Sequence, residues 1–176
     1  MARRASVQRL LKQMVDGWPA YQKRLQRSFR AAGLPADEDD EDLELTVERA
    51  VPVKALATFK RGVSRPLSPM LRERFAFAST IVNSGQVWLA AKEVAKATRS
   101  RRIRGHHKAR REHWEDSAPM RFEDSELSLF AMTPDAPEDV IYFVWKPEAT
   151  EPELWDYHGM SERKFKDLEA FLRWCR

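Results

Sequence analysis

The chain has 176 residues, enough for one domain with an extension, and its 43% of hydrophobic residues is enough for a core. Its single cysteine, Cys175, excludes a disulfide within the chain. No apolar run approaches the roughly 20 residues that cross a bilayer, and the N-terminal segment lacks the apolar centre of a signal peptide. We therefore expect a cytoplasmic protein with no membrane contact.

Charge is strongly segregated along the chain behind a net charge of +4. Residues 1–33 hold eight Lys and Arg against one acidic residue, and residues 34–50 hold eight Asp and Glu against one Arg. Residues 51–113 return to fifteen basic against three acidic residues, whereas residues 114–176 have fifteen acidic against seven basic. Such blocks predict contacts with one another or with a charged partner, and they carry little information about the fold.

The N-terminal segment, residues 1–35, is expected to form a helical extension. Its apolar side chains recur at the three- and four-residue spacing of a helix, at Val7, Leu10, Leu11, Met14, Trp18, Tyr21, Leu25 and Phe29. Pro19 lacks an amide hydrogen and is expected to kink or divide this helix. The acidic run that follows predicts a solvated linker over residues 36–45, with mimicry of a nucleic acid as the alternative.

Two helices are predicted next, followed by a short strand and another helix. Residues 46–61 carry an apolar residue at every fourth position, and Gly62 ends that pattern. After a turn, Ser68 as N-cap and Pro69 in the first helical turn predict a second helix that runs to about residue 83. Residues 86–97 predict a short strand or bend and then a helix, which leads into the most basic run of the chain.

The last third of the sequence predicts three antiparallel strands and a closing helix. Residues 126–132, 140–145 and 153–158 are apolar or alternate with period two, and proline-containing turns separate them. Ser161 is expected to cap a final helix that buries Phe165, Leu168, Phe171 and Leu172. N-terminal helices, a central antiparallel β meander and a closing C-terminal helix make an α+β fold, with residues 46–176 as its domain.

Catalytic motifs are missing from the sequence. It has neither a nucleophile elbow nor a phosphate-binding glycine loop. His106, His107 and His113 lack the spaced pairs of ligands that zinc usually takes, so they are expected to be surface or partner-contact residues. His158 and Cys175 are expected to be incidental. The prediction is a protein that is not an enzyme, with no catalytic residues, no metal and no cofactor.

The basic run Arg99–Arg111 leaves three interpretations open. Arginine suits phosphate oxygens because its planar guanidinium donates two parallel hydrogen bonds, which predicts a nucleic-acid contact. An acidic protein, or a solvated loop folded onto the acidic segments, also explains the run. Trp114, at the end of the run, is expected to be an exposed aromatic anchor, whereas most of the other tryptophans are expected in the core. The candidate partner-binding residues are Arg101, Arg102, Arg104, Arg110 and Trp114.

Short motifs from about residue 46 to residue 174 follow one another in a familiar order. They are Gly62-Val63, Pro66-Leu67-Ser68-Pro69, Asn83-Ser84-Gly85, Val87-Trp88-Leu89 and a phenylalanine-led helix at residues 165–172. In this order the chain resembles the SUKH superfamily, which is named for bacterial immunity proteins and is related to yeast cell-wall regulators. The resemblance implies a protein that neutralises a toxin by covering its active site, with no catalytic residues and no fixed contact surface to carry over.

We therefore expect a non-catalytic protein-binding module, an immunity protein whose partner is a toxin. A nucleic-acid-associated protein that uses Arg99–Arg111 is the first alternative. An enzyme whose site cannot be recognised in the sequence is the second.

Overall fold

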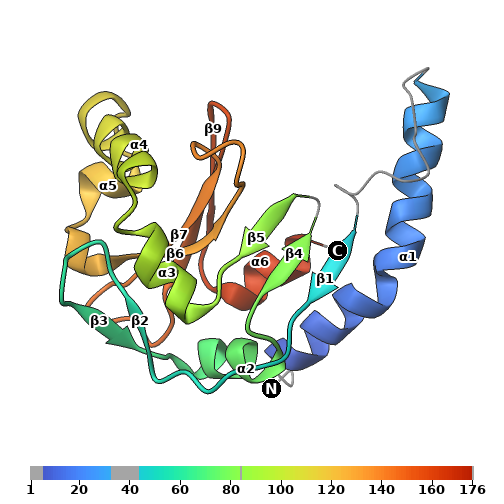
Figure 1. Cartoon of the computed structure of the whole chain (residues 1–176), viewed down its shortest axis with the longest axis horizontal. Coiled ribbons are helices and arrows are strands. Elements are labelled where there is room, and N and C mark those ends of the chain that lie inside the picture. Colours follow the sequence, from blue (N-terminus) through green and yellow to red (C-terminus); the bar gives the residue numbers. More distant parts are fainter. Residues whose placement is uncertain (1–5, 33–43, 84, 176) are drawn as a thin grey trace.

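The computed structural model describes residues 6–32, 44–83 and 85–175 and has the α+β fold that the sequence predicts (Figure 1). The acidic run at residues 37–42 lies outside the described residues. The helices are α1 (Val7–Ala31), α2 (Pro69–Phe77), α3 (Ala91–Ala97), α4 (Arg101–His113), α5 (Ala118–Arg121), the 3-10 turn η2 (Asp124–Glu126) and α6 (Leu168–Trp174). The strands are β1 (Leu45–Val47), β2 (Ala55–Ala57), β3 (Ser64–Pro66), β4 (Ile81–Asn83), β5 (Gln86–Trp88), β6 (Leu127–Met132), β7 (Val140–Val144), β8 (Glu153–His158) and β9 (Ser161–Phe165).

Seven of the strands form one antiparallel sheet in the order β1-β4-β5-β6-β7-β8-β9, and β2 pairs with β3 in a separate hairpin. The predicted meander is confirmed, because β6, β7 and β8 are consecutive neighbours in this sheet. Tyr142 of β7 lies between Leu129 of β6 and Trp155 of β8 in the register. The short strand and helix predicted at residues 86–97 are confirmed as β5 and α3.

Helices pack on both faces of the sheet. On the face that we name the α6 face, Phe171 of α6 lies 5.5 Å from the ring of Trp88, and α1 and α2 pack against α6. On the opposite face, which we name the α4 face, the Tyr157 hydroxyl accepts a hydrogen bond from the amide of Ala118 at 2.7 Å. The guanidinium of Arg110 lies over the same tyrosine ring, at 4.6 Å from its centroid.

The first half of α1 belongs to the core of this fold. Val7, Leu10, Leu11 and Met14 are buried in the same cluster as the residues of the sheet and of α6. The helix runs unbroken through Pro19, so the predicted division at this residue is wrong. Pro19 is exposed, and packing of the adjacent helical turns against α2 and α6 outweighs the one hydrogen bond that proline removes.

The helix predicted at residues 46–61 is wrong. Residues 45–47 form β1, which pairs with β4, and residues 55–57 form one strand of the β2–β3 hairpin. Extended backbone continues past β1, because Glu48 exchanges hydrogen bonds with Thr80 and Ser79. The β-branched residues of this segment favour extended structure, and pairing with β4 and β3 overrides the helical spacing of its apolar residues.

The start of α2 agrees with prediction, and its end does not. Ser68 caps the helix with its hydroxyl and Pro69 is in the first turn, but the helix stops at Phe77 and residues 81–83 form β4. The fully buried guanidinium of Arg74 donates to the carbonyl oxygens of Ala78, Ser79 and Trp88, at 2.5, 3.4 and 3.4 Å. The carbonyls of Ala78 and Ser79 follow the end of the helix, so Arg74 supplies them with a donor, and its bond to Trp88 ties this end to β5. Burial lowers the pKa of Arg74 to about 10.

The helix predicted to begin at Ser161 begins later. Residues 161–165 form β9, which pairs with β8 along its whole length, and Asp167 instead caps α6 by accepting from the amide of Ala170 at 2.8 Å. A helix starting at Ser161 and a strand paired with β8 would both satisfy the backbone groups of residues 161–165. Backbone hydrogen bonding therefore does not distinguish them, and the neighbouring strand β8, which a local pattern does not show, favours β9 over a longer helix.

Gly105 and Gly62 provide a matched test of the backbone. Gly105 lies inside α4, and a Cβ there meets no atom within 4 Å. We expect Gly105→Ala to raise the free energy of unfolding by about 0.5–1 kcal/mol, since glycine costs entropy in a helix. Gly62 has φ of +79° in the β2–β3 turn, so Gly62→Ala should lower it by about 1–2 kcal/mol. Urea unfolding measures both, and a loss of stability in Gly105→Ala would contradict the prediction.

Candidate functional site

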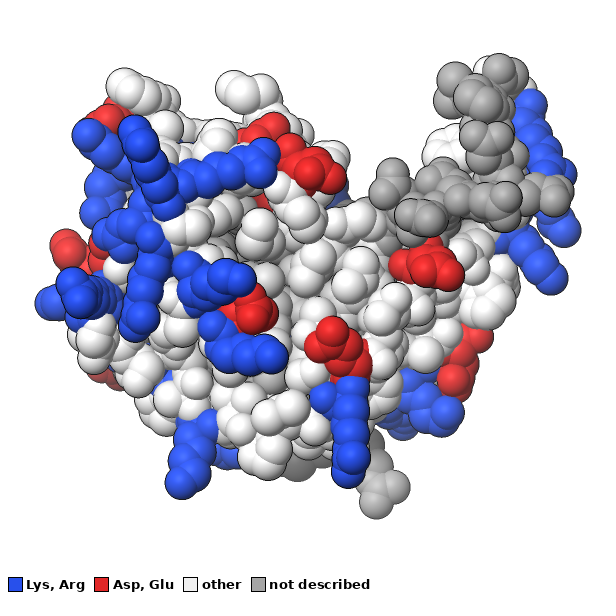
Figure 2. Space-filling model, viewed as in Figure 1, with Lys and Arg blue, Asp and Glu red and all other residues white. Residues whose placement is uncertain are grey.

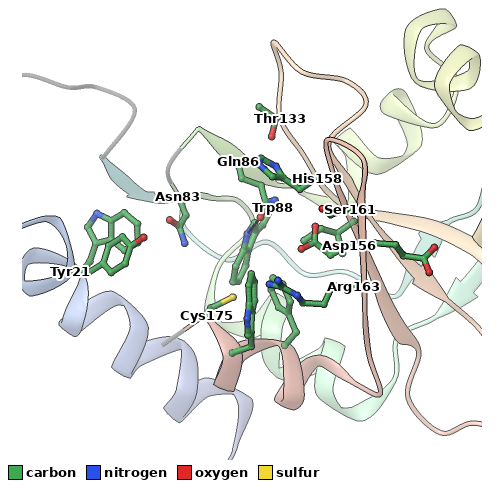
Figure 3. Close-up of a pocket in the computed structure, with 15 residues that line it drawn as sticks. Tyr21, Asn83, Gln86, Trp88, Thr133, Asp156, His158, Ser161, Arg163 and Cys175 are labelled. Atoms are coloured by element: carbon green, nitrogen blue, oxygen red, sulfur yellow. Dashed lines mark hydrogen bonds between the residues drawn. The ribbon is translucent and has the colours of Figure 1, made fainter. Parts of the chain in front are cut away.

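A groove of about 670 Å³ opens on the α6 face, where the helices leave part of the sheet uncovered. Figure 3 shows Tyr21 of α1 on one side of it and Asp156, Ser161 and Arg163 of the β8–β9 hairpin on the other. Trp88 and Phe171 lie between these walls. The remaining lining residues come from α1, the sheet and α6: Trp18, Asn83, Gln86, Thr133, Ile141, His158, Glu162, Trp174 and Cys175.

The alternation of β8 places polar side chains in the groove. Trp155 and Tyr157 are buried on the α4 face, so Asp156 and His158 point to the α6 face. In the register with β9, Asp156 lies opposite Arg163 and His158 lies opposite Ser161. The β8–β9 hairpin therefore presents four polar side chains side by side along one wall.

The floor of the groove is a cluster of aromatic rings centred on Phe171. The ring of Phe171 lies 5.5 Å from Trp88, 5.6 Å from Phe130, 5.3 Å from Phe165 and 6.1 Å from Trp174. Aromatic pairs at these distances are favourable beyond the area that they bury. The cluster joins α6 to strands β5, β6 and β9, so the shape of the groove depends on the core of the protein.

Aromatic side chains border this floor on two sides, Trp174 with Arg163 on one side and Trp18 with Tyr21 on the other. Trp174 is 51% exposed, and the guanidinium of Arg163 lies over its ring at 4.3 Å from the centroid. Across the groove, Trp18 and Tyr21 of α1 are in ring contact at 5.0 Å. The Arg163 contact holds Trp174 in one orientation, which lowers the entropy that its side chain would lose on binding a partner.

The groove also holds acidic groups near the β8–β9 turn. Burial raises the pKa of Asp156, although His158 and Arg163 lower it. Nearby, the carboxylate of Asp139 accepts a hydrogen bond from the amide of Gly159 at 2.7 Å and lies 2.8 Å from Nδ1 of His158. The raised pKa means that the negative charge of Asp156 is only partly compensated, so a cation placed beside it would be stabilised.

The groove residues that carry chemistry are not arranged as a recognised catalytic site. Burial raises the pKa of the Cys175 thiol to about 12, which keeps it protonated and weakly nucleophilic. The His158 side chain is paired with Asp139, but within the described residues no side-chain hydrogen bond joins it to Ser161. In the same parts of the chain, no three His, Cys, Asp or Glu side chains lie close enough to hold a metal ion.

The basic run forms helix α4, so the solvated loop considered for it is wrong. Three of its side chains contact Asp124, an acidic residue of the C-terminal third. Asp124 accepts hydrogen bonds from Arg111 at 2.6 Å and from His107 at 3.0 Å, and Arg104 lies at 3.6 Å. Burial raises the pKa of Asp124, but the hydrogen bonds from His107 and Arg111 outweigh burial and lower it on balance.

His107 is a core residue, which corrects its assignment to the surface. Its ring stacks on Phe59 at 4.0 Å, and burial lowers its pKa to about 4 in spite of the hydrogen bond to Asp124. The imidazole is therefore neutral at pH 7 and donates from Nε2 to the carboxylate. His106 and His113 lie on other sides of α4, half-buried and exposed respectively.

The candidate partner-binding residues do not share one surface. Arg110 is buried over Tyr157 and donates to the Glu138 carbonyl, and Trp114 is half-buried with its edge on the same tyrosine ring. Trp114 is thus not the exposed anchor that the sequence predicts. Arg102 is exposed and donates to the carbonyls of Pro134 and Asp135, whereas Arg101 is exposed and has no partner in the described parts of the chain.

Sequence reasoning missed the residues that meet in the groove. His158 and Cys175, which were expected to be incidental, both line it, and Trp174 is half-exposed at its edge. A signal for β8 was present, since Asp156 and His158 alternate with Trp155 and Tyr157 and must share the less buried face. For Trp174 and Tyr21, no local pattern marks them as neighbours.

Comparison of the chain with protein-family models, with curated proteins and with solved structures finds no match in any of the three. No helix of the described residues is long and apolar enough to cross a membrane. The proposals below therefore depend on the sequence and the geometry of the chain itself.

Phe171 and Trp174 should differ sharply in their effect on stability. Phe171→Ala removes the centre of the aromatic cluster, and we expect it to lower the free energy of unfolding by about 3–5 kcal/mol. Trp174→Ala should cost about 1 kcal/mol or less, because half of that side chain is already in water. Urea unfolding measures both variants, with Phe171→Leu as the conservative control. Equal losses for the two alanine variants would contradict this account of the floor.

Stability should fall as the pH drops, because His107 takes up a proton more readily in the unfolded chain. Its pKa is 6.5 when unfolded and about 4 when folded, so between these values only the unfolded state is protonated. We expect the free energy of unfolding to fall by up to about 3 kcal/mol from pH 7 to pH 4 through this residue. His107→Gln keeps a donor to Asp124 without titrating. An unchanged pH dependence in that variant would contradict the assignment.

Proposed function

We propose that the chain is a non-catalytic protein-binding module that works in the cytoplasm as an immunity protein and neutralises a toxin by covering its active surface. In this proposal the groove on the α6 face is the binding site. The observation that carries the proposal is the half-exposed Trp174, held by Arg163 over an aromatic floor at the edge of an open groove.

The residues of the groove are those that contribute most to protein interfaces. Binding energy at such interfaces is concentrated in Trp, Tyr and Arg side chains with preformed orientations. Trp174, Tyr21 and Arg163 provide these residue types on two sides of one groove. Polar side chains of the β8–β9 hairpin surround them, which matches the arrangement of an apolar centre and a polar rim.

The charge of the groove favours a basic segment of the partner. Asp156 keeps a raised pKa because burial is only partly offset by Arg163 and His158. A lysine or arginine of the partner beside Asp156 would stabilise its negative charge, and complementary charge speeds association. A toxin with a basic active surface has the chemistry that this groove selects.

The resemblance to the SUKH superfamily over residues 46–174 supports the same proposal, since that family is named for immunity proteins. The protonated thiol of Cys175 and the lack of a side-chain hydrogen bond between His158 and Ser161 in the described residues support a non-catalytic role. A protein that only covers the active surface of its partner transfers no protons. It therefore needs neither a reactive Cys175 thiol nor a hydrogen bond between the side chains of His158 and Ser161.

The proposal is tested by combining partner capture with groove variants. Affinity capture from a nuclease-treated lysate of the native host identifies the stoichiometric protein partner. Calorimetric titration then compares the intact chain with Trp174→Ala, Tyr21→Ala and Asp156→Asn. We expect Trp174→Ala to weaken binding by about 30-fold or more, the effect of losing a hot-spot residue.

Met120→Ala is the matched control, because Met120 is 55% exposed and lies outside the groove. It should leave the affinity unchanged. The toxic activity of the captured partner should be blocked by one equivalent of the intact chain and not by Trp174→Ala. The proposal fails if Trp174→Ala binds as tightly as the intact chain, or if a small fraction of an equivalent inactivates the partner by turnover.

A further inference from the structure

Exposed cations gather on the side of the molecule that carries α3 and α4. Figure 2 shows Lys and Arg side chains concentrated over these helices and the adjoining β2–β3 hairpin, at the left of the view. Apart from Arg104, which is paired with Asp124, the exposed cations of these elements and their connections are Lys60, Arg61, Lys92, Lys96, Arg99, Arg101, Arg102 and Lys108. We name this surface the basic face.

The elements of the basic face are fixed to one another by Arg104. Its guanidinium donates to the carbonyl of Phe59, beside the hairpin turn, at 3.0 Å and to the carbonyl of Thr98, at the end of α3, at 3.3 Å. The hairpin, α3 and the start of α4 therefore meet at one point. The cations of three separate sequence segments are brought to one surface in this way.

Most of these cations lack a carboxylate partner. Lys60, Arg61, Lys92, Arg99 and Arg101 form no ion pair with any described residue, since the cation-carboxylate contacts of this surface are Lys96 with Glu93 at 3.8 Å and Lys108 with Glu112 at 3.6 Å. Both contacts are long and exposed, so they contribute little. The basic face therefore presents uncompensated positive charge to solvent.

The outer side of α4 allows a ligand to approach closely. A shallow hollow of about 490 Å³ lies over Gly105 and Ala109, and Arg101, Arg102 and His106 border it. Arg101 and Lys108 are seven residues apart, two helical turns or about 10.5 Å along the axis. That length spans roughly three base-pair steps of about 3.4 Å in a duplex.

We propose that the basic face binds the phosphate backbone of a nucleic-acid duplex without reading its sequence. Neutralised phosphates release counterions, which makes unpaired surface cations effective ligands for them. Single strands are bound by exposed aromatic rings that stack on bases. The Phe, Tyr and Trp rings of this region of the chain, Phe59 and Trp114, are instead packed against His107 and Tyr157.

An acidic protein fits this surface less well. Protein interfaces depend on apolar or aromatic groups at their centre. The exposed large hydrophobic residues of the described chain are Val47, Val51, Met120, Met160 and Trp174, and none belongs to α3, α4 or the β2–β3 hairpin. The basic face offers charge without an apolar centre, as a polyphosphate ligand requires.

The test is a titration of a fluorescent 20-base-pair DNA duplex of arbitrary sequence with the full chain at several salt concentrations. One variant reverses three charges of the basic face, Lys96→Glu, Arg99→Glu and Arg101→Glu. The control variant reverses three charges of α1, Arg9→Glu, Lys23→Glu and Arg27→Glu, which changes the net charge equally. All six side chains are exposed, so circular dichroism should show both variants folded.

We expect the basic-face variant to depend less on salt. Its negative slope of log affinity against log salt should become shallower by about 2.7, which is about 0.9 for each lost phosphate contact. At low salt this is a loss on the order of 100-fold, whereas the α1 variant should stay close to the intact chain. Equal losses in the two variants would overturn the proposal, because they would show attraction by net charge alone. Competition by polyglutamate as strong as that by unlabelled duplex would also overturn it, because it would assign the surface to an acidic protein. Trp174→Ala should bind duplex normally, which separates this outcome from that of the groove.

Discussion

The contact of Phe171 with the sheet decides how much of the α6 face is covered. Its ring touches Trp88, Phe130 and Phe165, so α6 is held over β5, β6 and β9, and α1 packs against α6 from the side. A seven-residue helix is about 10 Å long and about 10 Å wide. A six-residue strand such as β8 is about 20 Å long. In either orientation α6 leaves part of that strand uncovered, and the uncovered part becomes the wall of the groove.

The elements that were predictable are those whose signal is local. The strands of the meander alternate or are continuously apolar, and Ser68 with Pro69 marks the start of α2 within two residues. The failures are three- to five-residue strands whose formation depends on a partner elsewhere in the chain. β1 requires β4, β9 requires β8, and the end of α2 requires the carbonyl of Trp88, fourteen residues beyond Arg74. Helical spacing over residues 46–61 was a real pattern that non-local pairing overrode.

The candidate site was less predictable than the fold, for a related reason. The sequence separates Tyr21 of α1, Asp156 of β8 and Trp174 of α6, and only the folded sheet brings them together. The basic run was recognisable in the sequence, but its spacing could not show that Arg104 and Arg111 turn toward Asp124 while Arg110 turns toward Tyr157. Arg110 is buried against the sheet, whereas Arg104 and Arg111 bind the carboxylate of Asp124 in η2 with side chains that remain 46% and 40% exposed. The cations of the basic face come from three segments, of which the run is one.

The two proposed surfaces lie on opposite sides of the sheet, since α4 covers the face that α6 does not. They approach each other at the β6–β7 loop, where Thr133 lines the groove and Arg102 of the basic face donates to the carbonyls of Pro134 and Asp135 at 2.9 and 3.1 Å. A charge change at Arg102 can therefore act on the groove through this loop. The two proposals are compatible in one chain, because neither proposed ligand needs the contacts of the other.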